Sequence, residues 1–146
     1  MKTITEALAA VATGSTTCRA LLEQARNAAE QAADLNPIAW VDWQAATSQA
    51  DALDAQVRAG SPLGPLHGVP VSIKDLFNVS GMPTRAGTRA RLDEIGSVEA
   101  ALVTRLRRAG ALIFAKTNMH EIALGATGEN LWTGDVKNPF LSLIHI

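Results

Sequence analysis

Two short apolar runs, separated by a segment of helical periodicity, constrain the fold of this chain more than any other feature. In the first run Val69, Val71 and Ile73 alternate with other residues, and the second is the unbroken stretch 111–115. An unbroken apolar run of strand length is typical of a strand buried on both faces, as in parallel sheets. Parallel neighbours need a crossover connection, which the intervening segment can supply. The pattern predicts an α/β architecture that contains a strand–helix–strand unit.

The crossover helix is predicted between Ser97 and Gly110. Ser97 is its expected N-cap, and Leu102, Val103 and Leu106 form an apolar stripe at helical spacing. Basic side chains crowd the last turn, where they complement the negative end of the helix dipole, and Gly110 ends the helix. The arginines of this region lack interleaved aromatic residues, which favours a solvated helix face over a nucleic-acid surface.

The first sixty residues are predicted to form a helical lead-in. Three helices are expected: one over residues 4–11, one from a cap at Ser15 or Thr16 as far as Leu35, and one through the apolar stripe 46–57. Asn36-Pro37 should end the second helix, because a residue that precedes proline avoids the helical region. Gly60 should end the third. This helical lead-in, residues 1–60, would precede the α/β part in residues 61–140.

Composition excludes several classes of protein. Hydrophobic residues make up 47% of the 146-residue chain and charged residues 18%, so wholesale disorder is not expected. The formal net charge of −1 gives no general attraction to nucleic acid or to anionic membranes. No signal peptide or membrane-spanning run is visible, and a cytoplasmic location is the default expectation. The single cysteine, Cys18, excludes an intramolecular disulfide and is predicted to be a small buried residue.

Lys74 is the strongest candidate for chemistry on position alone. It directly follows a predicted strand, where α/β proteins place functional groups. A partly desolvated lysine at such a place loses its proton more easily and can act as a base. The alternative is a lysine whose ammonium group extends into solvent, and position by itself favours that alternative. The neighbouring Asp75 could pair with Lys74 or occupy a turn, and the turn is preferred.

Other residues give weaker indications. The histidines His67, His120 and His145 have no metal-ligand spacing, so local hydrogen bonds are expected of them, and neither a metal nor a cofactor is predicted. The small polar loop from Gly125 to Asn130 could let a ligand approach the backbone closely, although an ordinary turn explains it equally well.

Five blocks along the chain resemble, in order and spacing, the motifs of the amidase-signature family. They are residues 64–75 (GPLHGVPVSIKD), 81–88 (GMPTRAGT), 115–121 (AKTNMHE), 128–130 (GEN) and 138–140 (NPF). The resemblance is strong over residues 60–140 and looser in the helical start. It implies the first strand–helix–strand units of the family's mixed sheet, and therefore an incomplete domain.

The resemblance also implies a mechanism. Members of the family use a triad of a serine, a serine on a cis peptide bond, and a lysine, and Lys74 aligns with the lysine. It would take the nucleophile's proton through the middle serine, since serine is a weak nucleophile without a base. An acyl-enzyme would follow, with backbone N–H groups at the oxyanion. In such an enzyme Gly125, Ala126 and Thr127, from the small polar loop, are candidates for contacts with a small-molecule amide substrate.

The chain departs from the family after residue 140. In the family a glycine- and serine-rich segment of the type Gly-Gly-Ser-Ser-Gly-Gly follows and carries the middle serine, with the nucleophile further on. Residues 141–146 (LSLIHI) resemble no part of the family, and Ser142 lies in no glycine-rich context. We therefore expect residues 1–140 to be the N-terminal part of one amidase-signature domain, 141–146 to be a foreign tail, and the chain by itself to be inactive.

Three functions stay open at this point. The parent protein could be an amide hydrolase, which the resemblance allows to form a homo-oligomer. It could instead be the amidase subunit of a tRNA-dependent glutamine amidotransferase, which needs partner subunits. The chain could also be a short binding protein without catalysis. The last hypothesis predicts cooperative thermal unfolding, whereas a fragment would expose apolar strand edges and pack poorly.

Overall fold

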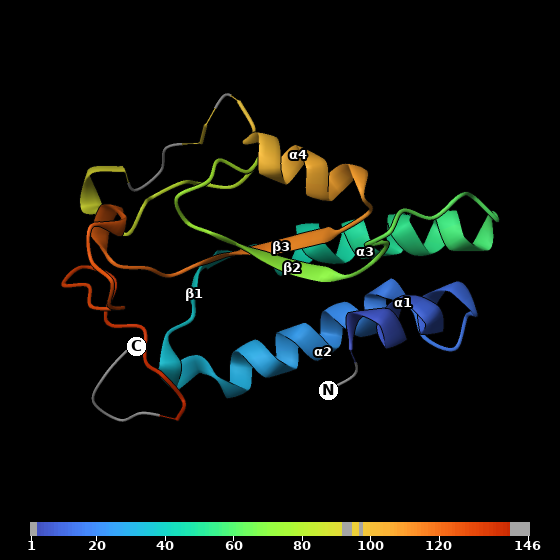
Figure 1. Ribbon diagram of the computed structural model, residues 1–146, viewed down its shortest axis with the longest axis horizontal. Coiled ribbons are helices and arrows are strands. Elements are labelled where there is room, and N and C mark those ends of the chain that lie inside the picture. Colours follow the sequence, from blue (N-terminus) through green and yellow to red (C-terminus); the bar gives the residue numbers. More distant parts are fainter. Residues whose placement is uncertain (1–2, 92–94, 97, 141–146) are drawn as a thin grey trace. The chain divides into compact units, whose positions relative to one another are not determined.

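The computed structural model describes residues 3–91, 95–96 and 98–140 of the chain (Figure 1). Its helices and strands are α1 (Ile4–Ala12), α2 (Cys18–Gln31), β1 (Ile38–Val41), α3 (Trp43–Arg58), β2 (Pro70–Lys74), α4 (Ala101–Arg108) and β3 (Leu112–Thr117), with short 3₁₀ turns at Ala33–Leu35, Arg89–Arg91 and Glu121–Ala123. The chain forms two compact units. Within the described residues, the first comprises 3–28, 42–71 and 104–114, and the second the remainder.

The three strands form a mixed sheet in the order β1-β3-β2. β1 is antiparallel to β3, with Ile38 opposite Thr117. Between β2 and β3, Leu112 N donates to Val69 O (2.9 Å) and Asp75 N donates to Thr117 O (3.2 Å). Because the residue numbers on the two strands rise together, this pair is parallel. The predicted crossover from β2 through α4 to β3 is confirmed.

The predicted helical lead-in is interrupted by a strand, β1, that was not predicted, and its second helix ends before Leu35. α2 ends at Gln31, and β1 follows a 3₁₀ turn and Asn36, which has a φ of 54°. The Asn36 amide donates to Thr133 O at 2.8 Å, so a contact distant in sequence fixes this turn. β1 has only four residues, and its partner strand lies about eighty residues further along the chain. No local pattern therefore reveals it.

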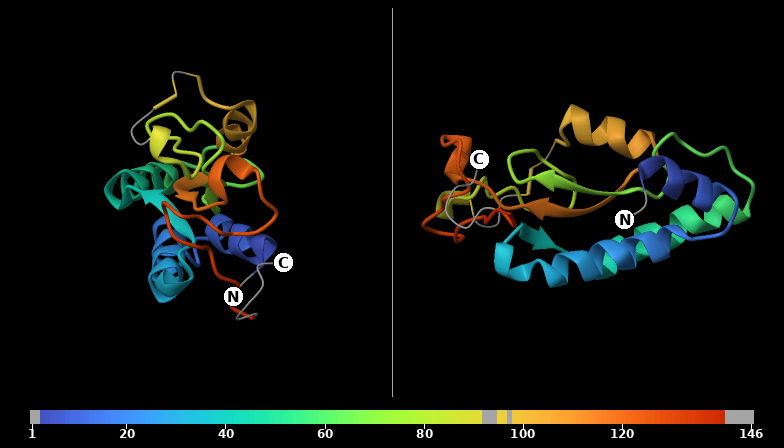
Figure 2. Two further views of the ribbon diagram at one scale, coloured as in Figure 1. Left: turned by 90° about the vertical axis from the view of Figure 1, so that its left-hand side faces the viewer. Right: turned by 60° about the horizontal axis from the view of Figure 1, so that its bottom comes forward.

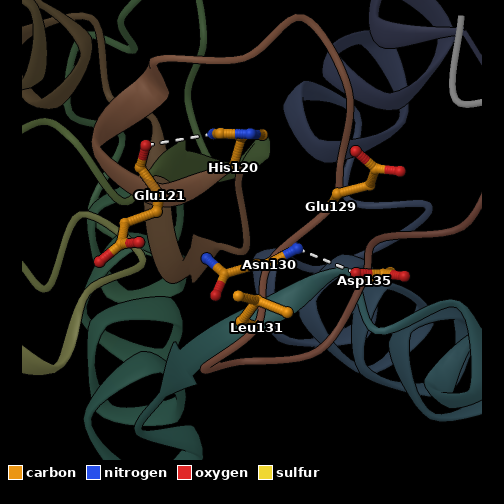
Figure 3. A pocket seen from close by; sticks show the side chains of 6 residues that line it. All are labelled: His120, Glu121, Glu129, Asn130, Leu131 and Asp135. Atoms are coloured by element: carbon orange, nitrogen blue, oxygen red, sulfur yellow. Dashed lines mark hydrogen bonds between the residues drawn. The ribbon is translucent and has the colours of Figure 1, made fainter.

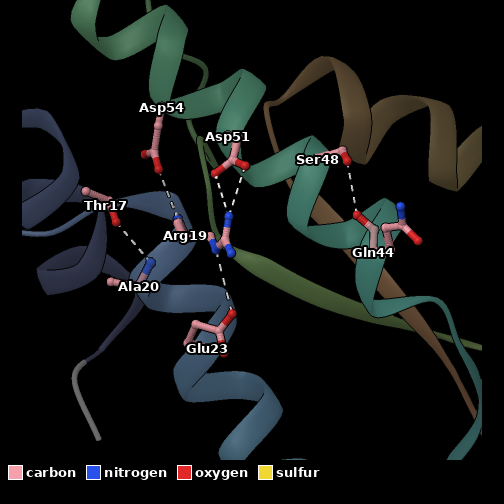
Figure 4. A network of polar contacts seen from close by, with 8 residues as sticks. All are labelled: Thr17, Arg19, Ala20, Glu23, Gln44, Ser48, Asp51 and Asp54. Carbon is pink, nitrogen blue, oxygen red and sulfur yellow. Dashed lines mark hydrogen bonds and ion pairs between the residues drawn. The ribbon is translucent and has the colours of Figure 1, made fainter.

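In the first unit, a side chain of α3 caps the N-terminus of α2 (Figure 4). Asp54 accepts hydrogen bonds from the backbone N–H groups of Cys18 (2.7 Å) and Arg19 (3.1 Å). The Thr17 hydroxyl accepts from Ala20 N at 3.0 Å, so Thr17 is the cap rather than the predicted Ser15 or Thr16. A buried carboxylate on α3 thus satisfies two backbone donors that an isolated α2 would leave open.

Cys18 is fully buried, as predicted. A Cβ atom at Gly68, whose φ is +74°, would collide with the Cys18 sulfur, so only glycine fits at that position. Burial raises the pKa of the Cys18 thiol to about 12, and the neighbouring Asp54 carboxylate contributes in the same direction. The thiol is therefore a packing group that stays protonated. Elsewhere in this unit α1 lies beside α2, as Figures 1 and 2 show.

The predicted strand 111–115 and crossover helix are present with changed details. β3 runs from Leu112 to Thr117 and is buried over residues 112–116, as expected of a strand covered on both faces. In α4 Val103 is buried but Leu102 is 47% exposed, so the apolar stripe is narrower than predicted. The expected cap Ser97 and the tail 141–146 lie outside the described residues. None of the helices described is both long enough and apolar enough to cross a bilayer.

Candidate active site

Lys74 is the last residue of β2, at the carboxyl end of the parallel strand pair. Its side chain is exposed, and it has no hydrogen-bond or ion-pair partner among the residues that the structure describes. The carbonyl of Lys74 accepts from Phe77 N at 3.1 Å, which closes the turn after the strand. The structure therefore places Lys74 at a fixed point with a free amine.

A second lysine, which the sequence analysis did not single out, lies on the neighbouring strand. Lys116 on β3 has 0% side-chain exposure, and its Nζ lies 2.8 Å from Asp75 Oδ1. Nζ also donates to Pro83 O and to the Thr84 hydroxyl, each at 3.0 Å. An ammonium group has three N–H donors. Two of them have acceptors in Pro83 and Thr84, and the Asp75 carboxylate balances the charge, so Lys116 is a structural cation.

Asp75 occupies the predicted turn, but its ion-pair partner is Lys116 and not Lys74. Its second carboxylate oxygen accepts from Arg85 N at 3.2 Å, and its carbonyl accepts from Ala86 N at 2.9 Å. These bonds connect the end of β2 to the segment that follows it. They fix the backbone immediately after Lys74 and so define where its side chain starts.

Burial lowers the pKa of Lys116, because the charged ammonium form is disfavoured away from water. The hydrogen bond and charge of the Asp75 carboxylate act in the opposite direction. The two lysines at this end of the sheet thus differ in environment. Lys116 is buried and paired with Asp75, whereas Lys74 is exposed and can contact a bound molecule.

Lys74 opens into a pocket of about 320 Å³. The other lining residues are Thr117, Asn118, Met119, His120, Ala123, Gly125, Ala126, Thr127, Gly128 and Val136. The structure therefore brings Lys74 together with Gly125, Ala126 and Thr127, the residues proposed from the sequence as substrate contacts. A pocket of this size is at the lower end of the range for small-molecule sites.

The loop that forms the far wall of this pocket has its own hydrogen bonds. Gly125 N donates to His120 Nδ1 at 3.1 Å. Gly128 O accepts from Val136 N at 2.9 Å. The Thr127 hydroxyl bonds the Glu129 carboxylate at 3.2 Å. The loop is thus more than an ordinary turn, because side chains on both sides determine its course.

Asn130 holds together three segments that are distant in sequence, a role that the sequence analysis missed. Its Nδ2 donates to Gly87 O (2.8 Å) and Met119 O (2.9 Å), and its Oδ1 accepts from Trp132 N (2.8 Å) and Thr133 N (3.1 Å). A Cβ atom at Gly87 would approach the Asn130 amide nitrogen to 2.7 Å, so Asn130 needs glycine opposite it. Both residues lie in blocks of the family resemblance, and that shared membership is the signal that could have suggested their contact.

The histidines behave as local hydrogen-bonding groups. A His67 ring nitrogen lies 3.1 Å from Leu53 O, and His120 bonds the Gly125 loop, while His145 lies outside the described residues. Within residues 3–140 as described, no three potential metal-ligating side chains gather at one place.

These observations describe a lysine at the carboxyl end of a parallel strand pair, beside a small pocket. The profile of the family described as Amidase matches residues 19–142. The chain belongs to the amidase family. Its helices and mixed sheet correspond to the N-terminal part of the amidase-signature fold, which the sequence had predicted.

Relatives in the amidase family carry two kinds of name. A glutamyl-tRNA(Gln) amidotransferase subunit from Bordetella petrii is 39% identical over 137 residues, which are 94% of this chain and 27% of the relative. A crystal structure of an amidase has 55% identity and a TM-score of 0.87, covering 94% of this chain and 31% of that one. A bacterial aryl acylamidase of the amidase-signature family has 28% identity and a TM-score of 0.89, with 96% and 30% covered.

The chain is short beside these amidase-family proteins. It spans between 20% and 29% of the lengths of its curated relatives. What the relatives do as whole proteins therefore depends largely on residues that have no counterpart here.

Proposed function

We propose that this chain supplies the base of an amide hydrolase, and that Lys74 is that base. The observation that carries the proposal is an exposed lysine, without a partner in the described residues, that lines a small pocket at the carboxyl end of a parallel strand pair. Substrate-binding crevices of α/β proteins form at such strand ends. Family membership gives the lysine its chemical context.

In the proposed reaction a serine hydroxyl attacks the carbonyl carbon of a small-molecule carboxamide. Lys74 accepts the hydroxyl proton through a second serine, the C–N bond breaks, and the amine leaves with a proton. Water then attacks the resulting acyl-serine and releases the acid. A positioned base contributes about 10²–10⁴-fold to such a step.

Lys74 fits this role better than Lys116. Lys116 donates to two buried acceptors and is paired with the buried Asp75 carboxylate, so loss of its proton would break that ion pair. Lys74 faces the pocket and can gain or lose a proton without disturbing any contact that the structure describes.

The middle serine of the proposed triad belongs to a glycine- and serine-rich segment, the nucleophilic serine lies beyond it, and the present sequence contains no such segment. We therefore propose that the chain by itself turns over no amide. A simple aryl amide incubated with the purified chain should remain intact. Turnover that disappears in Lys74→Met would show that the triad is complete within these residues.

A second candidate function follows from the names of the curated relatives. Several relatives between 35% and 43% identical are named as subunits of glutamyl-tRNA(Gln) amidotransferases. In that case the parent would release ammonia from glutamine and work with partner subunits. The amidase crystal structure at 55% identity favours the simple hydrolase instead.

A chimera tests the proposed role of Lys74. Residues 1–140 of this chain would replace the matching 31% of the amidase whose structure covers 94% of this chain. The chimera should hydrolyse an aryl amide, and Lys74→Met should lower kcat/KM by about 10²–10⁴-fold. Lys137→Met, at a lysine outside the pocket lining, is the matched control and should leave the rate unchanged.

The chimera also separates the two candidate functions. Ammonia release from glutamine that exceeds hydrolysis of aryl amides would favour the amidotransferase role. An active chimera whose Lys74→Met variant keeps its full rate would disprove the assignment of the base.

A further inference from the structure

His120 lies at the boundary of two pockets. It lines the Lys74 pocket and also a second one of about 370 Å³. The second pocket is lined in addition by Glu121, Glu129, Asn130, Leu131 and Asp135 (Figure 3). The imidazole therefore separates the proposed reaction pocket from an acidic neighbour. Neither the proposed triad nor the substrate loop, as assigned above, includes His120.

The imidazole and Gly125 are interlocked. Nδ1 lies 3.1 Å from Gly125 N, and a Cβ atom at Gly125 would collide with the ring. A backbone N–H can only donate, so Nδ1 must be the acceptor, and a neutral ring then carries its proton on Nε2. The position of Gly125 thus depends on both the lone pair and the shape of the His120 side chain.

The turn between these two residues is strained, and His120 helps to hold it. Ile122 and Ala123 have φ values of 50° and 58°, a left-handed conformation that a β-branched residue rarely adopts. Ala123 N donates to His120 O at 3.0 Å, and Ile122 N donates to Ala86 O at 2.8 Å. Such strain persists only where the surrounding contacts over-determine it, and it is common next to functional sites.

We propose that His120 is a positioning residue that fixes the Gly125–Thr127 wall of the Lys74 pocket and thereby limits the size of the acyl group that the pocket accepts. The limit on the size of the acyl group rests on the proposed amide-hydrolase function. The positioning of the Gly125–Thr127 wall by His120 does not, and it can be tested in this chain alone.

The Nδ1 atom has a second neighbour that makes the contact sensitive to charge. It lies 3.2 Å from the carbonyl oxygen of Glu121 (Figure 3). A protonated Nδ1 would donate to this carbonyl and could no longer accept from Gly125. Lys74 lines the first pocket together with His120, and three carboxylates, those of Glu121, Glu129 and Asp135, line the second.

The first test compares two replacements of His120 in the purified chain. His120→Asn keeps a side-chain acceptor near the position of Nδ1, and His120→Leu removes it while keeping bulk. The readout is the Gly125 amide in ¹H–¹⁵N NMR spectra. Loss of the bond in His120→Leu should speed hydrogen exchange of this amide by up to about tenfold, whereas His120→Asn should preserve the slow exchange. Equal exchange in the wild type and both variants would overturn the proposal.

A double substitution tests the interlock. Gly125→Ala should displace the loop and lower the urea midpoint, because the new methyl group meets the imidazole. In a His120→Ala background the same change should be tolerated, since the ring is gone. If Gly125→Ala is equally damaging in both backgrounds, the ring does not determine the wall.

Selectivity is measured in the chimera described above. His120→Leu should change the ratio of KM values for benzamide and acetamide by about tenfold, with a smaller effect on kcat. If the chimera is inactive but the Gly125 results hold, the proposed function fails and the positioning role stands. If the chimera is active with an unchanged KM ratio, the limit on acyl size is wrong.

Discussion

Replacing Lys116 with methionine removes the cation from a buried ion pair and leaves the Asp75 carboxylate without a counter-charge. The side chains are 0% and 2% exposed, so water cannot take over the lost interaction. Breaking a buried pair from one side costs about 3–5 kcal/mol of unfolding free energy. We expect Lys116→Met to lower the unfolding free energy by that amount in urea titrations followed by circular dichroism.

The double variant Lys116→Met/Asp75→Leu decides whether the cost belongs to the pair. With both charges gone, no buried charge is left unpaired. The double variant should therefore lose about 2–3 kcal/mol less unfolding free energy than the two single variants lose together. An exposed pair provides the control. Arg19 and Asp51 lie 3.0 Å apart with side chains 45% and 56% exposed, and Asp51→Asn should cost less than about 1 kcal/mol.

The variant Asp75→Asn adds a pH dependence with a defined sign. Burial already lowers the pKa of Lys116, and the amide removes the carboxylate that opposes this shift. Between the lowered pKa and the ordinary value of 10.5, the unfolded chain binds more protons than the folded one. The unfolding free energy of Asp75→Asn should therefore rise with pH in that alkaline window. The reasoning would be refuted if the losses of unfolding free energy in the two single variants added up to the loss in the double variant within about 0.5 kcal/mol. It would also be refuted if the unfolding free energy of Asp75→Asn did not change with pH in the alkaline window.

Three further outcomes are expected. Cys18 should resist iodoacetamide at pH 8 until urea unfolds the chain, and labelling of the folded chain would contradict this. Because the folded thiol keeps its proton to about pH 12, the unfolding free energy of the wild type should fall above pH 9, and that of Cys18→Ala should fall less. Asp54→Ala should lower the unfolding free energy by about 1–2 kcal/mol in urea titrations, because two backbone N–H donors of α2 lose their acceptor. An effect near zero would show that other groups cap α2. Ile122→Asn should raise the urea midpoint by relieving about 1 kcal/mol of strain, whereas a lower midpoint would mean that the isoleucine side chain contributes more than its backbone costs.

The strand–helix–strand unit could be predicted because its signals are local. The alternation at Val69, Val71 and Ile73 and the run 111–115 mark two strands by themselves, and the segment between them has helical spacing. β1 had no such signal. Four half-buried residues after a proline become a strand only because β3 offers hydrogen bonds from far along the chain.

The candidate site was predictable in part for the same reason. The strand end pointed to Lys74, and the small polar composition of the loop pointed to Gly125–Thr127, but no local pattern places the two side by side. The pair of Asp75 and Lys116 stayed hidden, because a lysine at a strand end normally extends into solvent. Its burial depends on Pro83 and Thr84, which supply acceptors from a loop about thirty residues earlier in the chain.

The pairing of β1 with β3 has a consequence for how this chain is made. Ile38 leaves the ribosome about eighty residues before Thr117, its partner across the sheet. At roughly 5–20 residues per second, that interval lasts between about 4 and 16 seconds. During this time β1 has no strand to join, and its apolar residues are open to chaperones or to neighbouring chains. A pause in translation before residue 112 would lengthen this exposure, while synonymous changes after residue 117 would not.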